Sequence, residues 1–416
     1  MSPRPFTILF IIAALAGAWF TGFATADFAS HLDRQVHDIH CAWAPGLVDD
    51  DASASSGCKV TMMSPYSSVL RTLVWGGIPI ALPGLATFAF LVFRGLDLFL
   101  NRREGDRGAA RFLVVASLVP VLTSAVMGYL SIVELGTTCK LCVGTYVSSA
   151  ACLAFALGAW RSSMAPTMAE DIAIGAGAET EASGGGFGGL FVGFATLGGF
   201  VAVPSLVYLI LAPDFSNFIG ACGSLPAPED KFGVMIALDE NSGVPNAIEV
   251  FDPLCPSCKA FEERLEASGL DSQLHRSAVL FPLDQTCNWN VGETLHPGAC
   301  TISGAILCAE GNADAVIAWA FVNQEAIMAA TKADPTAAAA MVSAQFPQVA
   351  ACLGTPATKI KLTRSLKWAV ANHLPVLTPQ LYVEGVKLCD EDTDLGMDWA
   401  LSRLIANPKA KAEATP

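Results

Sequence analysis

The sequence predicts two structural classes in one chain: an all-α membrane bundle in its N-terminal half, followed by an α/β domain. Three observations favour this division. The 416 residues are 53% hydrophobic and only 15% charged, whereas globular proteins average roughly 25% charged residues. Five apolar stretches are long enough to cross a bilayer. After the last of them, a Cys-x-x-Cys pair lies between an expected strand and an expected helix.

Each expected span contains about 20 mostly apolar residues, the length that crosses a bilayer as a helix. The spans cover residues 6–25, 72–93, 112–133, 142–160 and 186–212. We therefore expect a four-helix membrane domain at 1–160, a cytoplasmic linker at 161–185, a fifth transmembrane helix at 186–212 and an extracytoplasmic domain at 213–416. The alternative for the first span is a cleaved signal peptide, but its apolar run is longer than a usual signal core.

The arginines of the second connection set the orientation. Lys and Arg accumulate in cytoplasmic loops, and the connection 94–111 carries Arg94, Arg102, Arg103, Arg107 and Arg111. The loop 26–71, the turn before the fourth span and everything after 212 then lie outside. All but one of the 13 cysteines fall on that side, where disulfides persist. The net charge of −14, without a basic patch, argues against a nucleic-acid partner.

Cys139 and Cys142 have Cys-x-x-Cys spacing where the fourth span begins. A helix N-terminus stabilises a thiolate, and a thiolate at the membrane edge can exchange electrons with a lipid-soluble acceptor. Tyr146 lies one turn further on the same helix face, where its hydroxyl could meet a quinone carbonyl. The alternatives are half of a zinc site, a structural disulfide and, for Tyr146, an interfacial membrane anchor.

Two further cysteines, Cys41 and Cys58, lie in the expected outer loop. A pair in a mobile loop can carry electrons between a soluble partner and a buried site. The alternative is a static staple of the loop. Cys152 lies within the fourth span and is expected to be a small apolar residue of the core.

Residues 1–160 resemble the vitamin K epoxide reductase family. The resemblance rests on Ser-Gly-Cys58 followed by Ser64-Pro65-Tyr66-Ser67, on Gly77-Ile-Pro-Ile-Ala-Leu82, and on Cys139-x-x-Cys142-x-x-Thr145-Tyr146. It implies that Cys142 faces a quinone (ubiquinone or menaquinone), that Cys139 exchanges with Cys58, and that Cys41 meets the soluble partner. It also implies functional roles for Ser64 and for Tyr146, the latter in the quinone pocket. Two departures from the family are a long Cys41–Cys58 interval and an apparent insertion at 71–76.

The C-terminal domain carries a second redox signature. An apolar strand is expected at Asn246–Phe251, and Cys255-Pro-Ser-Cys258 follows it, leading into a helix over about 259–267. Such a pair between a strand and a helix is a redox motif, because the helix N-terminus lowers the pKa of the first thiol. The alternative is again zinc. Six more cysteines allow 15 pairings, and structural staples are expected: Cys222, Cys287, Cys300, Cys308, Cys352 and Cys389.

This second motif and Thr378-Pro379 at the start of an expected strand resemble the thioredoxin-like superfamily. The resemblance implies that Pro379 is a cis-proline beside the redox pair, that Cys255 is the nucleophile and that Cys258 resolves the mixed disulfide. A helical insertion at about 299–369 resembles the periplasmic disulfide-introducing branch. The dipeptide Pro256-Ser257 lacks the histidine common in strongly oxidising members.

The sequence thus predicts a relay that oxidises reduced secreted or periplasmic proteins. Electrons pass through Cys255/Cys258, Cys41/Cys58 and Cys139/Cys142 to a membrane quinone, in the inner membrane of a bacterium with the thioredoxin-like domain in the periplasm. One alternative is a reductive relay running the other way, since nothing in the sequence sets the direction. Another is a non-enzymatic, membrane-anchored binding module. The sequence does not identify the quinone, the client proteins or the oligomeric state.

Overall fold

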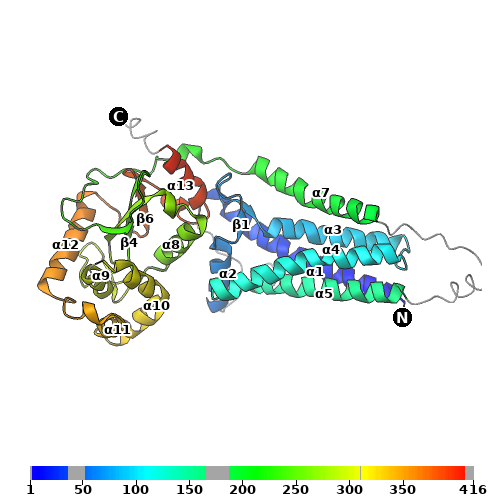
Figure 1. The fold of residues 1–416 in the computed structure, drawn as a ribbon, viewed down its shortest axis with the longest axis horizontal. Helices are drawn as coiled ribbons and strands as arrows, with labels where there is room; N and C mark the ends of the chain where they lie inside the picture. Colours follow the sequence, from blue (N-terminus) through cyan, green and yellow to red (C-terminus); the bar gives the residue numbers. More distant parts are fainter. Residues whose placement is uncertain (1, 36–51, 165–186, 310, 408–416) are drawn as a thin grey trace, which may run out of the picture. The chain divides into compact units, whose positions relative to one another are not determined.

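The computed structural model describes residues 2–35, 52–164, 187–309 and 311–407. It divides into two compact units, Met1–Pro213 and Asp214–Pro416 (Figure 1). Cys41 and nearly all of the expected linker lie outside the described residues. Each unit is described by itself below.

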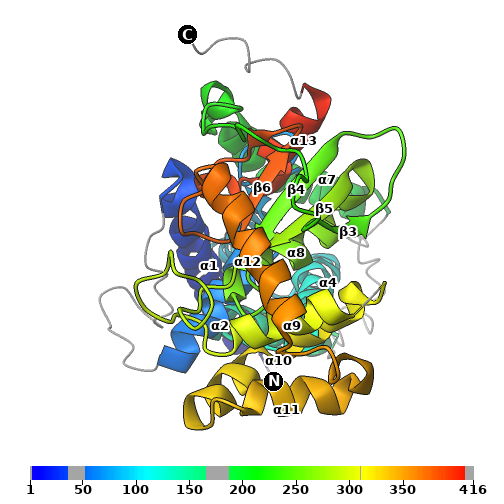
Figure 2. The same ribbon diagram turned by 90° about the vertical axis from the view of Figure 1, so that its left-hand side faces the viewer.

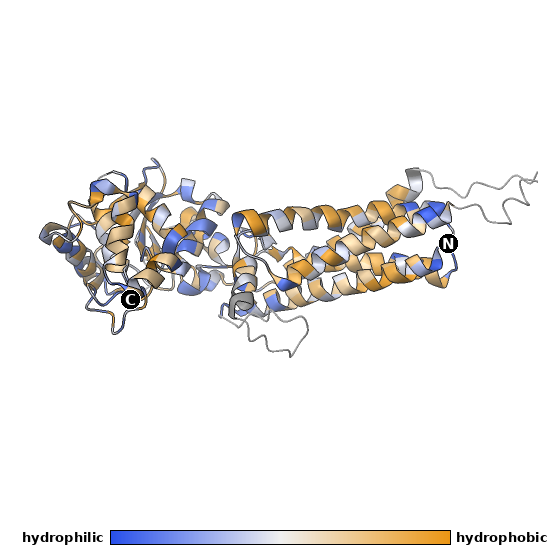
Figure 3. Ribbon diagram, turned by 90° about the horizontal axis from the view of Figure 1, so that it is seen from below, coloured by the Kyte–Doolittle hydropathy of each residue, from blue (hydrophilic) through white to orange (hydrophobic). Residues whose placement is uncertain are grey.

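The first unit is a bundle of long helices. Its helices are α1 (Arg4–Ser30), α2 (Ala52–Met63), α3 (Ala81–Leu100), α4 (Arg107–Tyr129, continued by a π-helical turn at Leu130–Glu134), α5 (Lys140–Ser163) and α7 (Phe187–Leu211). All but α2 are long and apolar enough to span a membrane, and hydrophobic residues run along their lengths (Figure 3). α1 packs against α3 and α5, α4 against α5, and α7 against α3. The predicted membrane bundle with a fifth helix is confirmed.

The second span begins later than predicted. We expected it from residue 72, but α3 begins at Ala81. Before it the chain forms a small antiparallel pair, β1 (Ser68–Val69) with β2 (Ile78–Pro79). Gly76 and Gly77 adopt φ of +74° and +72°, a left-handed conformation that glycine tolerates without a Cβ clash. The apolar residues between 72 and 80 therefore belong to a folded loop, in which Trp75 is buried.

The second unit is built on one five-stranded mixed sheet. Its strand order is β3 (Ile236–Asp239), β5 (His275–Leu280), β4 (Asn246–Phe251), β6 (Gln380–Val383) and β7 (Val386–Lys387). β4 and β5 are parallel, and the other neighbours are antiparallel. α12 (Pro356–Ala371) covers one face, and α8 (Pro256–Ser268) with α13 (Met397–Ala406) covers the other (Figures 1 and 2). This is a thioredoxin-like fold, as the sequence predicted.

A helical insertion interrupts the thioredoxin-like topology between β5 and β6. It consists of α9 (Ala299–Cys308), α10 (Ala313–Ala333) and α11 (Ala337–Gln345), leading into α12. Its apolar side chains form one core with residues around the Cys255 turn. The insertion is therefore part of the domain's core and packs directly beside the redox pair.

Three disulfides settle the pairing that the sequence left open. They join Cys222 to Cys389, Cys287 to Cys300 and Cys308 to Cys352. Among the described residues, Cys222, Cys389 and Glu391 also form a cluster of metal-ligand type. Because its two sulfurs are bonded to each other, this cluster has no thiolate to offer a metal.

Candidate functional site

The first candidate site is a buried group of cysteines in the membrane unit. Cys139 is the N-cap residue of α5, and Cys142 lies in the first turn of that helix. Cys58 reaches them from α2, and its Sγ lies 2.9 Å from Sγ of Cys139. Leu141 and partly buried apolar residues of α1, including Phe20 and Phe23, enclose the sulfurs. The fold thus brings together cysteines that are 81 residues apart.

The state of these cysteines suits an exchange reaction. Cys139 and Cys142 are free thiols, whereas Cys58 is disulfide-bonded. Its expected partner, Cys41, lies outside the described residues. Thiol–disulfide exchange requires a thiolate to approach one sulfur of a disulfide. The contact between Cys139 and Cys58 meets that requirement.

A cavity of about 340 Å³ opens beside the cysteines, within the membrane unit. This volume lies in the range of small-molecule pockets. Its wall includes Cys58, Cys139, Cys142 and Tyr146, together with Asp27 of α1. The remaining wall comes mainly from α1, α3, α4 and α5 and contains many apolar residues. The cavity therefore suits an apolar molecule that presents a few polar atoms to the sulfurs and to the tyrosine.

The structure separates the two residues that the sequence assigned to quinone binding. Tyr146 lines the cavity one turn after Cys142. Ser64 is buried but does not contribute to the cavity wall. Its hydroxyl donates a hydrogen bond of 2.8 Å to the carbonyl of Thr61, an interaction that ends the last turn of α2. Direct contact of Ser64 with a quinone remains a prediction.

The second candidate site is the Cys-x-x-Cys turn between β4 and α8. Cys255 is the N-cap of α8, and Pro256 occupies the first helical position, where the missing N–H of proline costs nothing. Cys255 is 4% exposed and Cys258 is fully buried. The peptide bond between Thr378 and Pro379 is cis, as predicted, and the carbonyl of Thr378 lies 3.7 Å from Sγ of Cys255.

The two thiols of this turn differ in acidity. A hydrogen bond from Cys258, aided by the backbone at the helix N-terminus, lowers the pKa of Cys255 to about 6, although burial opposes the shift. Burial raises the pKa of Cys258 well above its ordinary value. At neutral pH Cys255 is therefore the thiolate. Because the thiolate is the nucleophile in thiol exchange, this difference in acidity suits Cys255 as the attacking residue. The roles of Cys255 as nucleophile and Cys258 as resolving thiol stay predictions.

Comparison with known proteins identifies the first unit. Residues 8–157 match the vitamin K epoxide reductase family. This match covers most of the membrane unit, Met1–Pro213. For the second unit, a solved structure of the oxidoreductase DsbA from Xylella fastidiosa is similar over 41% of this chain and 95% of that chain, with 20% identity and a TM-score of 0.28. No curated protein matches the chain.

The chain is thus a vitamin K epoxide reductase domain fused to a thioredoxin-like domain, and it is a thiol–disulfide oxidoreductase. Each domain contributes one free Cys-x-x-Cys pair at a helix N-terminus. The five apolar helices make it a membrane protein.

The structure reveals two residues that support the Cys255–Cys258 pair and that the sequence did not point to. Gln324 of the insertion donates hydrogen bonds to the carbonyls of Cys255 (2.9 Å) and Pro253 (3.3 Å). The carboxylate of Asp252 accepts from the N–H of Leu254 at 2.7 Å and from that of Leu283 at 2.6 Å. Asp252 stands three residues before Cys255, a position that could have been noticed. Gln324 gives no local signal, because its partners lie about 70 residues away in the sequence.

Proposed function

We propose that this chain is a quinone-dependent oxidase of protein thiols that introduces disulfides into secreted proteins. The observation that carries the proposal is the 2.9 Å contact between Cys58 and Cys139 in the wall of the cavity. It joins a disulfide on the outer segment to the membrane dithiol and to a space fit for an electron acceptor. Oxidation of clients is the direction that the low pKa of Cys255 favours, because an acidic thiol is a good leaving group.

The first transfer balances as follows. A client thiolate attacks Sγ of Cys255, the bond to Cys258 breaks, and Cys258 leaves as a thiolate that takes up a proton. The second client thiol loses its proton and attacks the client sulfur of the mixed disulfide. The client disulfide forms and Cys255 leaves as a thiolate. Two client thiols have become one disulfide, the Cys255–Cys258 pair carries the two electrons, and one proton has been released.

The same exchange, repeated twice, carries the electrons inward. The Cys255/Cys258 dithiol reduces the Cys41–Cys58 disulfide, whose thiols in turn reduce an oxidised Cys139–Cys142 pair. The tether between the domains gives the soluble domain a high effective concentration near the membrane domain. A quinone, either ubiquinone or menaquinone, accepts two electrons and two protons. Cys142 and Tyr146 would hold its polar edge, and the apolar wall of the cavity would hold its ring.

The arginines support an inner-membrane location with the cysteines outside. Arg102 and Arg103 lie in the connection between α3 and α4, and Arg107 opens α4. Within the membrane unit this connection lies at one end of the bundle, whereas α2 and β1, beside the cysteines, lie at the other (Figure 1). Because basic residues stay on the cytoplasmic side, the cysteine end faces the periplasm and the thioredoxin-like domain follows it there.

Oxidation of a dithiol peptide by the purified full-length chain tests the proposal. With quinone present we expect peptide disulfide and quinol in equal amounts. Cys142→Ala should abolish quinol formation while the oxidised Cys255–Cys258 pair still completes one exchange with the peptide. The matched control is Cys152→Ala, which alters a buried cysteine of the same helix and should keep both activities. Quinol formation at the normal rate by Cys142→Ala would refute the proposal.

A further inference from the structure

His296 lies next to the redox turn of the thioredoxin-like domain, although it is 41 residues beyond Cys255 in the sequence. Its Nδ1 is 2.8 Å from a carboxylate oxygen of Asp252, which is fully buried. That same carboxylate holds the N–H groups of Leu254 and Leu283. Among the described residues, His296 is the cationic partner that Asp252 has within salt-bridge distance.

The position of Asp252 creates an electrostatic problem for the reaction. The N–H of Cys255 donates to the carbonyl of Asp252 at 3.1 Å, so the carboxylate and the nucleophile belong to one turn. A buried carboxylate is costly unless it is paired, and its negative charge opposes a neighbouring thiolate. The dipeptide Pro256-Ser257 supplies no positive charge of its own. A cation from elsewhere in the fold would offset the charge of Asp252.

We propose that His296 is a positioning residue, held by Asp252, whose positive charge offsets that carboxylate and favours the thiolate of Cys255. The proposal deepens the function given above and rests on it. His296, which comes from a distant loop, then supplies a positive charge beside a redox motif that has no histidine between its two cysteines. In the oxidising direction it speeds the last step, because Cys255 then leaves the mixed disulfide as a stabilised anion.

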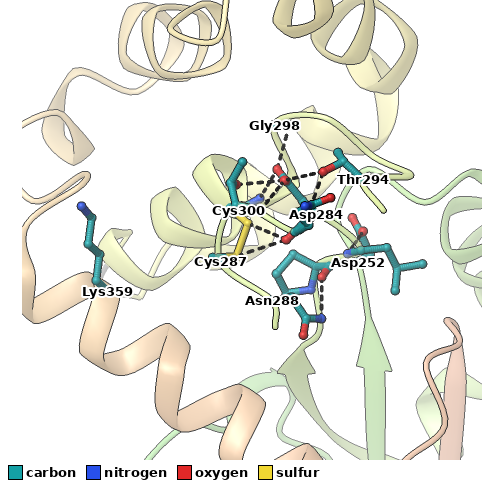
Figure 4. The surroundings of a disulfide bond; sticks show 12 residues. Asp252, Asp284, Cys287, Asn288, Thr294, Gly298, Cys300 and Lys359 are labelled. Carbon is teal, nitrogen blue, oxygen red and sulfur yellow. Dashed lines mark hydrogen bonds between the residues drawn. A yellow bond between two sulfur atoms is a disulfide. The ribbon is translucent and has the colours of Figure 1, made fainter. Parts of the chain in front are cut away.

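The loop that carries His296 is firmly fixed. The disulfide between Cys287 and Cys300 closes the segment around it. The N–H groups of Leu295 and His296 both donate to the carbonyl of Leu283, at 2.9 and 3.2 Å. Buried Asp284 fastens the segment from inside, since it accepts from Thr294 and from the N–H of Gly298 (Figure 4). This arrangement holds the imidazole in place instead of leaving it to sample solvent.

The charge of His296 follows from its surroundings. Burial lowers the pKa of His296, but the hydrogen bond and the negative charge of Asp252 outweigh that effect, and the charges of Cys255 and Asp284 act in the same direction. The net result is a raised pKa. The imidazole is therefore protonated up to a higher pH than a free histidine would be, and it loses the charge as the pH rises further.

The test measures how fast Cys255 is alkylated as a function of pH in the reduced, full-length protein, read by mass spectrometry of the peptide that carries it. Removing a nearby positive charge makes the thiolate harder to form. For His296→Gln we expect the profile to move to higher pH, with a rate near pH 6 lower on the order of tenfold, which corresponds to one pKa unit. The Cys255–Cys258 disulfide should also become less oxidising in glutathione buffers.

Two variants separate charge from structure. His296→Lys keeps a positive charge and should retain the fast alkylation near pH 6. His373→Gln changes an exposed histidine at the end of α12 and should leave the profile unchanged. A wild-type profile for His296→Gln, or equal slowing in the Lys and Gln variants, would overturn the proposal. If His296→Gln does not fold, the Lys variant decides, because its charge does not titrate near neutral pH and slow alkylation there would contradict the charge effect. None of these readouts requires quinone turnover, so failure here is distinct from failure of the proposed function.

Discussion

Glu249 is a fully buried acid in β4, and it shares one arginine with two other acids. Arg276 on β5 lies 3.3 Å from Glu249 and makes a double contact with Glu262 of α8, at 2.8 and 2.7 Å. The carboxylate of Asp239 contacts Nε of Arg276. Burial, followed by repulsion from Glu262, raises the pKa of Glu249 to about 8. The side chain is therefore harder to ionise than an ordinary glutamate.

This shift predicts a pH-dependent stability of the thioredoxin-like domain. An acid with a higher pKa in the folded than in the unfolded chain stabilises the fold fully at low pH. That stability is lost as the pH rises from the ordinary value of 4.5 through about 8. Glu249→Gln, which fixes the uncharged state, should flatten the pH dependence in that window and make the domain more stable than wild type near pH 8. Pulse proteolysis of the full-length chain at several pH values measures this.

The control for that prediction is Glu229→Gln, which alters an exposed acid of the same domain and should leave the dependence unchanged. An identical slope in Glu249→Gln would mean that other groups cause it.

At the scale of single residues, the sequence reveals only relationships between residues that are close together in the chain. Cys255 and Cys258 could be recognised because a strand, a Cys-x-x-Cys spacing and a helix follow one another directly, from Asn246 to Ser268. The pairing of Asp252 with His296, or of Glu249 with Arg276, depends on strands and loops that meet only in the folded domain. Ser64 shows the opposite limit: a motif could name the residue, but only the fold shows its side chain bonded to Thr61.

At the scale of helices, the close contact between α1 and α5 depends on a glycine. A Cβ added to Gly144 of α5 would lie 2.7 Å from the ring of Phe20 on α1. Small residues allow membrane helices to approach in this way. Phe20 also packs against Cys58, Cys139 and Leu141, so this contact supports the cysteine group.

Gly144→Ala should therefore displace the ring of Phe20 and loosen the membrane site. Overpacking of this kind costs about 1–3 kcal/mol. We expect a lower melting temperature in detergent and faster alkylation of Cys139 in the reduced protein. Gly199→Ala is the matched control, because a Cβ at that position of α7 meets nothing within 4 Å. Equal effects of the two substitutions would show that the contact with Phe20 is not what matters.

Among the elements, those with a clear periodicity could be predicted and those made by glycine could not. The strand Asn246–Phe251 has the predicted ends, because a short apolar run bounded by turn residues predicts a buried strand. The second span was misplaced at its start, since hydropathy cannot distinguish a buried loop from the first turns of a helix. Only the positive φ of Gly76 and Gly77 and the pairing of β1 with β2 distinguish them.

At the scale of the molecule, the proposed function requires electrons to pass between two domains that are each complete. If Cys58 is that connection, Cys58→Ser should leave the soluble pair without a route to quinone. Cys255 and Cys258 should then accumulate as the dithiol in cells, while Cys139 and Cys142 stay oxidised. Acid trapping, alkylation and mass spectrometry of the two peptides measure both states.

Lys59→Ser, an exposed neighbour in α2, is the control and should keep the soluble pair oxidised. An oxidised Cys255–Cys258 pair in Cys58→Ser would mean that the loop cysteine is only a structural staple and that Cys255 reaches the membrane pair directly.

The order of the domains was readable from the sequence because hydropathy changes abruptly near residue 212. The pairing of Cys222, Cys287, Cys300, Cys308, Cys352 and Cys389 was not, because it depends on how distant segments return to one another. That of Cys222 with Cys389 spans 167 residues.

That last disulfide changes what a cut in the chain can do. Cys222 lies shortly after the last membrane helix, and Cys389 lies just before the final helix α13. A protease that cleaves a surface loop of the insertion, in a compartment where disulfides persist, would produce two fragments that remain covalently joined. Both would stay attached to the bilayer, and on a non-reducing gel the nicked protein would run as one chain. The damage would be visible only after reduction. The thioredoxin-like domain would stay anchored to the membrane although its backbone had been cut.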